Sequence, residues 1–391
     1  MSISPNIEQA HYVLTDRAVL VAACMISGVG ALVFNAFPLF LSVTANQFGL
    51  NDTQLGLLGT TYLGGFAVVA LFAPIWMPRI EWRSIAVVAG VLILSALLGE
   101  ILTDNVFVVY LAMAVVGVGA SILYTIGLTI LTRAVDTERA FGIKLMYEMA
   151  IAGLLMYVML KVVIEKFGFT GFIVGTAILF LGSLLFVSRL PLNFMMREAK
   201  YNNSDEWDGA GSRHLAWASA AALFVQFAAF SAVWGFMERI GVDNGLAAET
   251  VGSILSLSIL AGFVGALVAA VIGNKCGYVA PLTVGLVLSI LAVAILATSK
   301  GQGPFAIGAC VVNGMLQFSV VYQMGLLTHN DYSGKIAVMI PFILASGGAI
   351  GPGIAGVIVE SSGLLRVYCG FAVIAVLVIA LSVWIGRQER A

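Results

Sequence analysis

The sequence predicts an all-α polytopic membrane protein with 12 transmembrane helices in two pseudo-symmetric six-helix halves. Its 391 residues are 61% hydrophobic and only 10% charged, whereas a soluble domain typically has about a quarter charged residues. Long apolar runs follow one another along the chain, separated mostly by short links. Because a helix needs about 20 mostly apolar residues to cross a bilayer, each run is predicted to span the membrane.

Twelve runs of this kind can be marked, and each is predicted to form one helix. They cover roughly residues 18–44, 53–76, 84–101, 106–132, 140–164, 171–188, 215–240, 251–272, 279–298, 303–329, 334–359 and 365–386. The first run is too long for the core of a secretory signal, and the polar stretch before it has one strong cation, Arg17. We therefore expect a retained first transmembrane helix.

One long polar stretch, RLPLNFMMREAKYNNSDEWDGAGSRH, separates six runs from six. It predicts an N-terminal bundle over 1–188, a cytoplasmic linker over 189–214 and a C-terminal bundle over 215–391. At an offset of 196 residues, FNAFPLF at 34–40 aligns with FSAVWGF at 230–236, sharing the first Phe, one Ala and the last Phe. The two halves are therefore predicted to be related.

The distribution of Lys and Arg predicts the orientation. If the N-terminus is cytoplasmic, the inner segments hold 14 of the 19 basic residues, and the outer ones hold Lys161, Lys166, Arg239, Lys300 and Arg366. Cytoplasmic loops of membrane proteins carry such an excess of Lys and Arg. Both termini are therefore expected on the cytoplasmic side of the inner or plasma membrane. A net charge of −1 gives no indication of a nucleic-acid partner, and we expect a monomer.

The cysteines and histidines predict neither a disulfide nor a metal site. The four cysteines form no C-x-x-C pair, and the three histidines form no H-E-x-x-H pattern. The cysteines are expected to serve as small apolar filler, and no cofactor is expected. A membrane-embedded enzyme would need His, Asp or Cys clustered at one depth, which the sequence does not predict. No Walker loop is present, so we do not expect ATP to drive the protein directly.

The fifth predicted helix carries an ionisable pair, Lys144 and Glu148, within GIKLMYEMAIAGLLMYVML. An ionisable side chain at mid-bilayer costs about 2.5–3.5 kcal/mol on insertion scales. Counting about 1.5 Å of rise per residue from Ala140, Glu148 lies roughly 12 Å deep, close to the middle of a ~30 Å core. Two interpretations remain open. Either Glu148 binds a proton or a cationic part of a solute, with Lys144 tuning it or meeting an anion, or the pair only locks this helix to a neighbour.

Other polar and aromatic side chains are predicted at similar depths. They could contact a solute, or they could form hydrogen bonds between helices, worth about 0.6 kcal/mol each. We expect several of the following to bind solute: Asn35, Tyr62, Tyr124, Tyr147, Gln226, Trp234, Asn313, Gln317 and Tyr322.

Charged residues near the ends of the predicted helices are expected to meet water. Interface charges or gate pairs fit the four at inner ends, which are Arg133, Arg139, His329 and Asp331. Surface anchoring is expected of the three near outer ends, which are Glu100, Glu238 and Arg239.

Small residues at four-residue multiples predict faces where helix backbones come close. These are Gly347, Gly351 and Ala355 with Gly348 and Gly356 in the eleventh run, and Ala261, Gly265 and Ala269 in the eighth.

Across essentially its whole length the chain resembles the major facilitator superfamily. That family carries the motif G-x-x-x-D-R-x-G-R-R after its second helix and a degenerate copy after its eighth. PIWMPRIEWR stands in the first place and matches at Arg79 and Arg83; AVIGNKCGY stands in the second, with Lys275 in the place of Arg and Gly277 retained. The resemblance implies that these loop residues steady one gating state, although positive-inside topology would also explain the cations.

The resemblance also implies a secondary transporter that moves a small organic solute by alternating access. Related halves facing a shared midplane site are a common transporter plan, and in this family helices 1, 4, 7 and 10 line the cavity. The single deep carboxylate favours proton-coupled symport. The antiporter signature G-P-x-x-G-G is missing from the fifth helix, whereas GGAIGPGIAG occurs in the eleventh. Efflux of drugs or metabolites in exchange for protons stays an alternative, as does a non-transporting sensor of the same fold.

Overall fold

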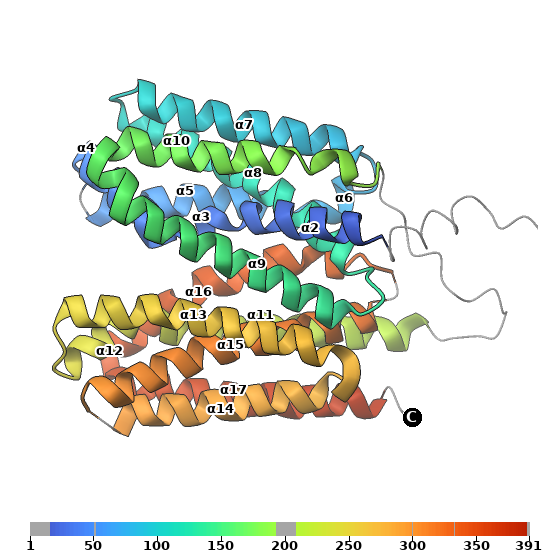
Figure 1. Ribbon diagram of the computed structural model, residues 1–391. Coiled ribbons are helices and arrows are strands. Elements are labelled where there is room, and N and C mark those ends of the chain that lie inside the picture. The colour runs from blue at the N-terminus through green and yellow to red at the C-terminus, as the bar shows by residue number, and fades with distance from the viewer. Residues whose placement is uncertain (1–15, 51, 193–208, 299, 332, 389–391) are drawn as a thin grey trace, which may run out of the picture. The chain divides into compact units, whose positions relative to one another are not determined.

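The structure is a computed structural model that describes residues 16–50, 52–192, 209–298, 300–331 and 333–388. Regular secondary structure in these ranges is entirely helical (Figure 1). The chain forms two compact units, the first made of Met1–Val135 and Tyr147–Glu198, the second of Asp136–Met146 and Ala199–Ala391. Most of the predicted linker lies outside the described residues, and the predicted domain boundaries stay a prediction.

The first half of the chain folds into six helical rods. Their helices are α2 (Arg17–Gly30), α3 (Leu32–Asn35), α4 (Phe37–Phe48), α5 (Asp52–Leu71), α6 (Ala73–Trp76), α7 (Trp82–Leu102), α8 (Val106–Leu131), α9 (Thr137–Val158), η1 (Met159–Val163), α10 (Ile164–Leu184) and η2 (Val187–Arg189). The first rod consists of α2 to α4, the second of α5 and α6, and the fifth of α9, η1 and the start of α10 up to the kink at Gly168. Pro38 and Pro74 stand in the first turn of α4 and α6. Proline has no N–H and fixes φ, so it favours helix starts, and here it divides two of the predicted runs.

The second half also folds into six rods. Its helices are α11 (Gly209–Trp234), α12 (Met237–Asp243), α13 (Ala248–Ile272), η3 (Gly273–Cys276), α14 (Val279–Thr298), α15 (Gln302–Asn330), η4 (Ala337–Met339), α16 (Ile340–Ser362) and α17 (Leu364–Gln388). Six rods before the linker and six after it agree with the twelve predicted spans. Within the described ranges, nine helices are long and apolar enough to cross a membrane, and α2 and part of α5 are shorter apolar helices.

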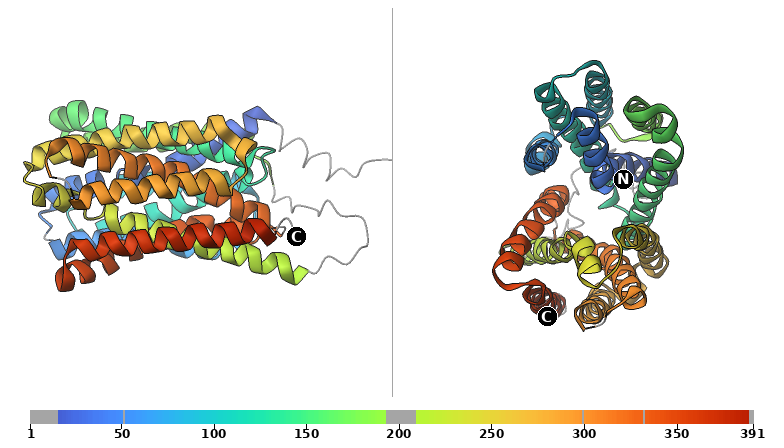
Figure 2. Two further views of the ribbon diagram at one scale, coloured as in Figure 1. Left: turned by 90° about the horizontal axis from the view of Figure 1, so that it is seen from below. Right: turned by 90° about the vertical axis from the view of Figure 1, so that its left-hand side faces the viewer.

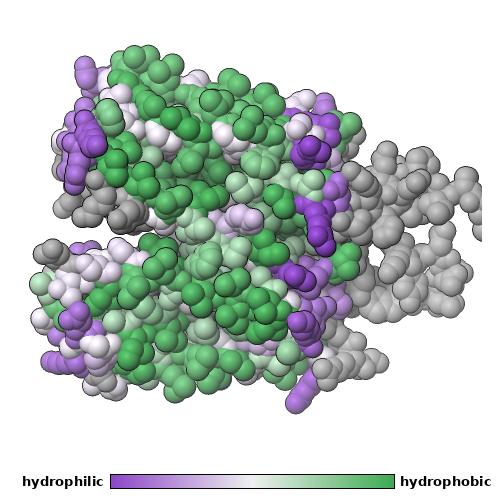
Figure 3. All heavy atoms as spheres, viewed as in Figure 1, coloured by the Kyte–Doolittle hydropathy of each residue, from purple (hydrophilic) through white to green (hydrophobic). Residues whose placement is uncertain are grey.

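The outer surface of the rods is apolar midway along their length. Large aliphatic side chains such as Val91, Leu98 and Val357 are 55–69% exposed. In both units hydrophobic atoms cover the middle of the visible face and hydrophilic atoms gather at the helix ends (Figure 3). Contiguous apolar surface of this extent is unfavourable in water, so these faces are suited to lipid.

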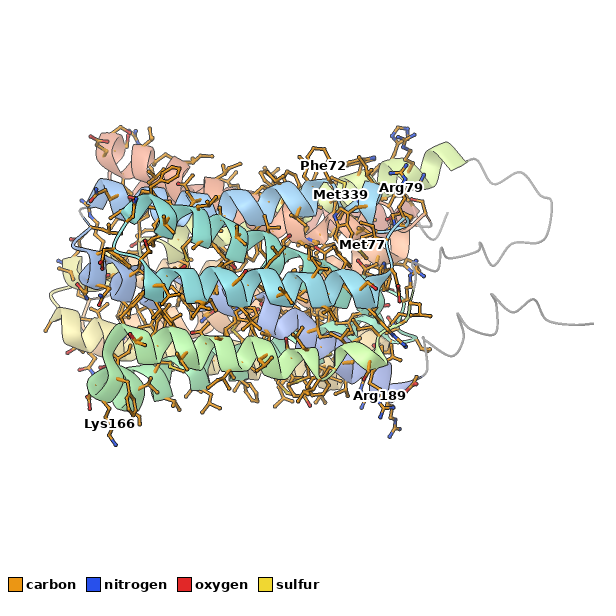
Figure 4. All side chains as sticks on the ribbon, turned by 90° about the horizontal axis from the view of Figure 1, so that it is seen from above. Phe72, Met77, Arg79, Lys166, Arg189 and Met339 are labelled. Atoms are coloured by element: carbon orange, nitrogen blue, oxygen red, sulfur yellow. The ribbon has the colours of Figure 1, made fainter. Side chains whose placement is uncertain are left out.

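Basic side chains of the first unit lie at both ends of its rods, as the predicted alternation requires. Arg79 and Arg189, predicted on the inner side, lie at one end, and Lys166, predicted on the outer side, lies at the other (Figure 4).

Close backbone packing in the first unit centres on α8, which contacts α2, α5 and α7. A Cβ added at Gly117 would overlap the carbonyl oxygen of Tyr62, and one added at Gly65 would overlap that of Ala114. Hydrophobic burial gives helices no reason to associate in lipid, so small residues that allow such approach stabilise the bundle. The helices of each unit are seen end-on in the right-hand view of Figure 2.

In the second unit α15 has the corresponding place, in contact with α11, α13 and α14. A Cβ at Gly265 would overlap the Gly314 carbonyl oxygen, and one at Gly351 would overlap that of Ala228 in α11. The predicted small-residue faces of the eighth and eleventh runs are therefore confirmed at Gly265 and Gly351. Since α8 and α15 are the fourth rods of their halves, this shared pattern agrees with the predicted relation between the halves.

Gly351→Ala and Gly353→Ala test this packing as a matched pair on α16. A Cβ at Gly353 meets no atom within 4 Å, so Gly353→Ala should keep or raise stability through helix propensity. Gly351→Ala should lower it by about 1–3 kcal/mol, as overpacking does. The check is thermal unfolding of the purified protein in detergent, and equal melting temperatures for the two variants would contradict the observed contact.

Candidate functional site

The carboxylate of Glu148 points into the first unit. The residue is 5% exposed, and Asn35 of α3 donates an Nδ2–H hydrogen bond to its Oε1 at 2.8 Å. Gly28 of α2 lies against the same residue, because a Cβ there would be 3.8 Å from the Glu148 backbone nitrogen, an ordinary contact distance. The predicted depth of Glu148 thus coincides with burial between the first and fifth rods.

Two tyrosines extend this polar region. Tyr62 of α5 is fully buried and interacts electrostatically with Glu148. The ring centroids of Tyr62 and Phe66 are 6.4 Å apart, and those of Phe66 and Tyr124 in α8 are 5.7 Å apart. Asn35, Tyr62 and Glu148, here named the Glu148 cluster, are therefore brought together from three rods. Their role in binding stays a prediction.

The two other predicted residues of α9 differ in burial. Lys144 is fully buried, whereas Tyr147 is half-buried. Burying an ammonium group is unfavourable unless it is paired, so the burial of Lys144 marks it as a residue with a specific task. Lys144 belongs to the Asp136–Met146 segment of the second unit.

The predicted polar residues of the second unit fall into two groups. Asn313 of α15 donates an Nδ2–H hydrogen bond to the Ser258 carbonyl oxygen of α13 at 2.9 Å, so its amide joins two helices. Gln226 of α11 is 1% exposed, and neither of its amide atoms has a hydrogen-bond partner in the described structure. An unsatisfied buried polar group costs about 1–3 kcal/mol. Gln226 is therefore the stronger candidate for contact with a ligand.

The remaining candidates of this unit differ in how deeply they are buried. Tyr322 is fully buried and its hydroxyl has no hydrogen-bond partner in the described structure, while Trp234 and Gln317 are half-buried. Tyr322 interacts electrostatically with Glu138 and Asp136 at the start of α9. It therefore lies within electrostatic reach of that end of the unit.

The predicted loop cations bind backbone carbonyls at helix ends. Arg83 donates from Nε to the Leu190 oxygen at 2.6 Å, tying α7 to the segment after η2. Arg79 and Lys275 each donate to the carbonyl four residues earlier, at 2.8 and 3.4 Å. Gly277 has φ +66°, a conformation that favours glycine. These contacts cap helices, and the gating role implied by the resemblance stays a prediction.

Two charged residues near helix ends differ from expectation. Asp331 caps η4, because its Oδ2 accepts the N–H groups of Ile336 and Ala337 at 2.7 Å each. Glu100 is 1% exposed and its Oε1 has no hydrogen-bond partner in the described structure. Surface anchoring is therefore wrong for Glu100. It shares a helix face with the buried Ile93 and Leu97, and that spacing could have predicted its burial.

Glu138, in the first turn of α9, is 1% exposed and was not predicted as a candidate from the sequence. Phe141 and Leu145, three and seven residues later, are buried as well. This helical spacing of large apolar residues could have predicted that Glu138 is buried.

Rods long enough to cross a bilayer, built in two related halves with buried polar groups at depth, define a polytopic membrane transporter fold. The family model of the Major Facilitator Superfamily matches residues 19–343. The chain belongs to this family of membrane transporters.

Solved structures agree on the fold. The MFS transporter FucP in an outward conformation superposes with a TM-score of 0.70 at 16% identity, covering 94% of this chain and 98% of that one. A variant of the E. coli fucose:proton symporter FucP gives 0.70 at 15% over the same shares. The human organic anion transporter MFSD10 gives 0.75 at 12%, covering 94% and 99%. No curated protein sequence matches the chain.

A double-mutant cycle of Asn35→Ala and Glu148→Gln tests the central contact of the Glu148 cluster. A hydrogen bond to a charged group contributes about 1.5–3 kcal/mol, so the two changes should be coupled by an amount of this order. The measurement is denaturant unfolding in mixed micelles. Additive losses of stability in the double variant would show that the hydrogen bond contributes nothing.

Proposed function

We propose that the protein is a secondary active transporter that moves a small organic solute by alternating access, coupled to protons in symport. The observation that carries this proposal is the Glu148 cluster, a carboxylate held at membrane depth by Asn35 and beside Tyr62. Ionisable groups in transmembrane segments are rare and mark ion or proton pathways. Glu148 is the proposed proton carrier, with Lys144 as its neighbour one helical turn away.

The solute would use neutral polar groups as well. Gln226 offers both an amide donor and an acceptor that no other described group uses. Asn35, Tyr62, Tyr124, Tyr147, Trp234, Gln317 and Tyr322 are proposed as further contacts. Asn313 is the weakest of the set, because its amide is already bonded to α13.

The substrate can be sought by thermal shift of the purified protein against metabolite classes at two pH values. Transport of any stabilising compound is then measured in proteoliposomes with an inward proton gradient. Glu148→Gln mimics the protonated carboxyl, so it should abolish uphill accumulation while exchange of solute across the membrane continues. Uphill accumulation in Glu148→Gln vesicles at the level of the unmodified protein would refute the proton-carrier role.

Two comparisons make this test specific. Glu165→Gln changes an exposed glutamate of α10 in the same chemical way and should transport normally. Solute extrusion that is driven by the same gradient would instead assign the protein to efflux. Absence of any solute flux in a protein that binds the solute would assign it a sensing role.

Gln226→Leu and Asn313→Leu separate a ligand contact from a structural hydrogen bond. Leu at 226 removes an unsatisfied buried amide, so stability should be unchanged or higher, while solute affinity should fall by roughly tenfold, as for one lost hydrogen bond of about 1.4 kcal/mol. Leu at 313 removes the bond to α13 and should lower the melting temperature. The opposite pattern in thermal-shift titrations would exchange the two assignments.

A further inference from the structure

A buried carboxylate lies at the start of α9, at the helix end predicted to be cytoplasmic. The Asp136–Met146 segment belongs to the second unit, and Glu138 points into that unit. A Cβ added at Gly325 of α15 would lie 2.7 Å from Glu138 Oε1 and 3.1 Å from Tyr278 Cε1. The carboxyl group therefore fills the space left by the missing side chain of Gly325, beside the Tyr278 ring.

The segment around Glu138 is packed tightly against the same unit, and we name Asp136–Met146 the α9 anchor. A Cβ at Gly142 would lie 2.6 Å from the Ala270 nitrogen of α13. Asp136 Oδ2 lies 2.7 Å from the Cβ position of Gly273, where the chain turns at φ +53°. Asp136 also accepts the Arg139 N–H at 2.9 Å. The anchor thus rests on α13 and η3 as well as on α15.

The titratable groups near Glu138 come from three parts of the chain. They are Asp136 just before α9 with Arg139 in its first turn, Cys276 and Tyr278 in η3 and the turn after it, and Tyr322 and His329 in α15. The Tyr278 and His329 ring centroids are 5.2 Å apart. Tyr278 acts on Glu138 through a hydrogen bond, and Asp136 and Tyr322 act on it electrostatically; none of these three side chains is a cation. Neither oxygen of Glu138 makes a hydrogen bond of standard geometry in the described structure. Burial beside a second carboxylate favours the neutral form of the Glu138 carboxyl group.

The protonation of Glu138 is linked to its burial. Glu138 precedes the predicted span 140–164, and burial raises the pKa of its carboxyl above the ordinary value of 4.5. Its own backbone N–H and Tyr278 lower this pKa, and Asp136 raises it, with a net upward shift. The packed state therefore binds the proton more tightly than a released state would. Its stability should fall as pH rises from about 4.5 through the raised pKa.

We propose that Glu138 is a second proton-binding site, separate from the Glu148 cluster, whose protonation holds the α9 anchor against α13 and α15. Loss of this proton leaves a buried carboxylate beside the carboxylate of Asp136, and the anchor then releases. The proposal concerns the anchor alone and needs no solute, so it can fail or succeed independently of the transport proposal.

The test follows the accessibility of the anchor in the purified full-length protein in lipid nanodiscs. The four cysteines are replaced by serine, and Ala140→Cys, at a position that is 8% exposed, places a reporter thiol on the anchor. The labelling rate with a methanethiosulfonate reagent is measured from pH 5 to pH 9. This labelling rate is divided by the rate measured at the same pH in the Glu138→Gln variant, which mimics the protonated acid. In the resulting ratio the pH dependence of thiol reactivity cancels.

The expected ratio is near one at pH 5 and rises with pH, by roughly tenfold for each unit by which the pKa is raised. A second reporter, Ala112→Cys, lies in α8 at 7% exposure, and its ratio should stay near one. A ratio at Ala140→Cys that is flat across the pH range would overturn the proposal.

A measurement on the unmodified protein covers the case in which Glu138→Gln does not fold. Hydrogen exchange of the backbone amides of 136–146, corrected for intrinsic rates, is compared with that of α8. Protection of the anchor should fall as pH rises while that of α8 stays constant. Protection of the anchor that does not change with pH would overturn the proposal by itself.

Discussion

Backbone contact between helices determines where the buried polar groups of this protein lie. In lipid an apolar side chain gains little by leaving the solvent, so helices associate through close packing and a few hydrogen bonds. Gly65 and Gly117 bring α5 and α8 together, and Gly265 brings α13 against α15. At Gly28 α2 lies against α9 at an ordinary contact distance, and the Asn35–Glu148 hydrogen bond joins the same two rods seven residues further along the first of them.

The spans themselves could be predicted from the sequence because the length of an apolar run is set by membrane thickness. The run 279–298 coincides with α14, and 106–132 differs from α8 by one residue. The interruptions within rods could not be predicted in this way. Pro38 and Pro74 end one helical segment and begin another without changing the hydropathy of the run that contains them.

Burial of the candidate residues was only partly predictable. Position along the predicted span was enough to single out Glu148, but its partner Asn35 is 113 residues away and depends on packing. Near helix ends depth is uninformative, because the helix face decides exposure there. Glu100 and Glu138 both continue buried stripes of their helices, so face periodicity outweighs nearness to water. For Asn313 the sequence was misleading in the opposite way. Its residue type and its position along the helix fit a ligand contact, but its amide donates a hydrogen bond to α13.

The π-helical turn Met159–Val163 lies within the fifth rod, before the chain turns at Gly168, and it affects how the chain can be compared with its relatives. A π turn closes its hydrogen bonds one residue later than an α turn, so it behaves as a one-residue insertion into a helix. A homologue that lacks one residue here could continue as an ordinary α-helix through the whole of this rod. A one-residue gap in an alignment at this point would then record a change of helix type and leave the register of Glu148 unaltered.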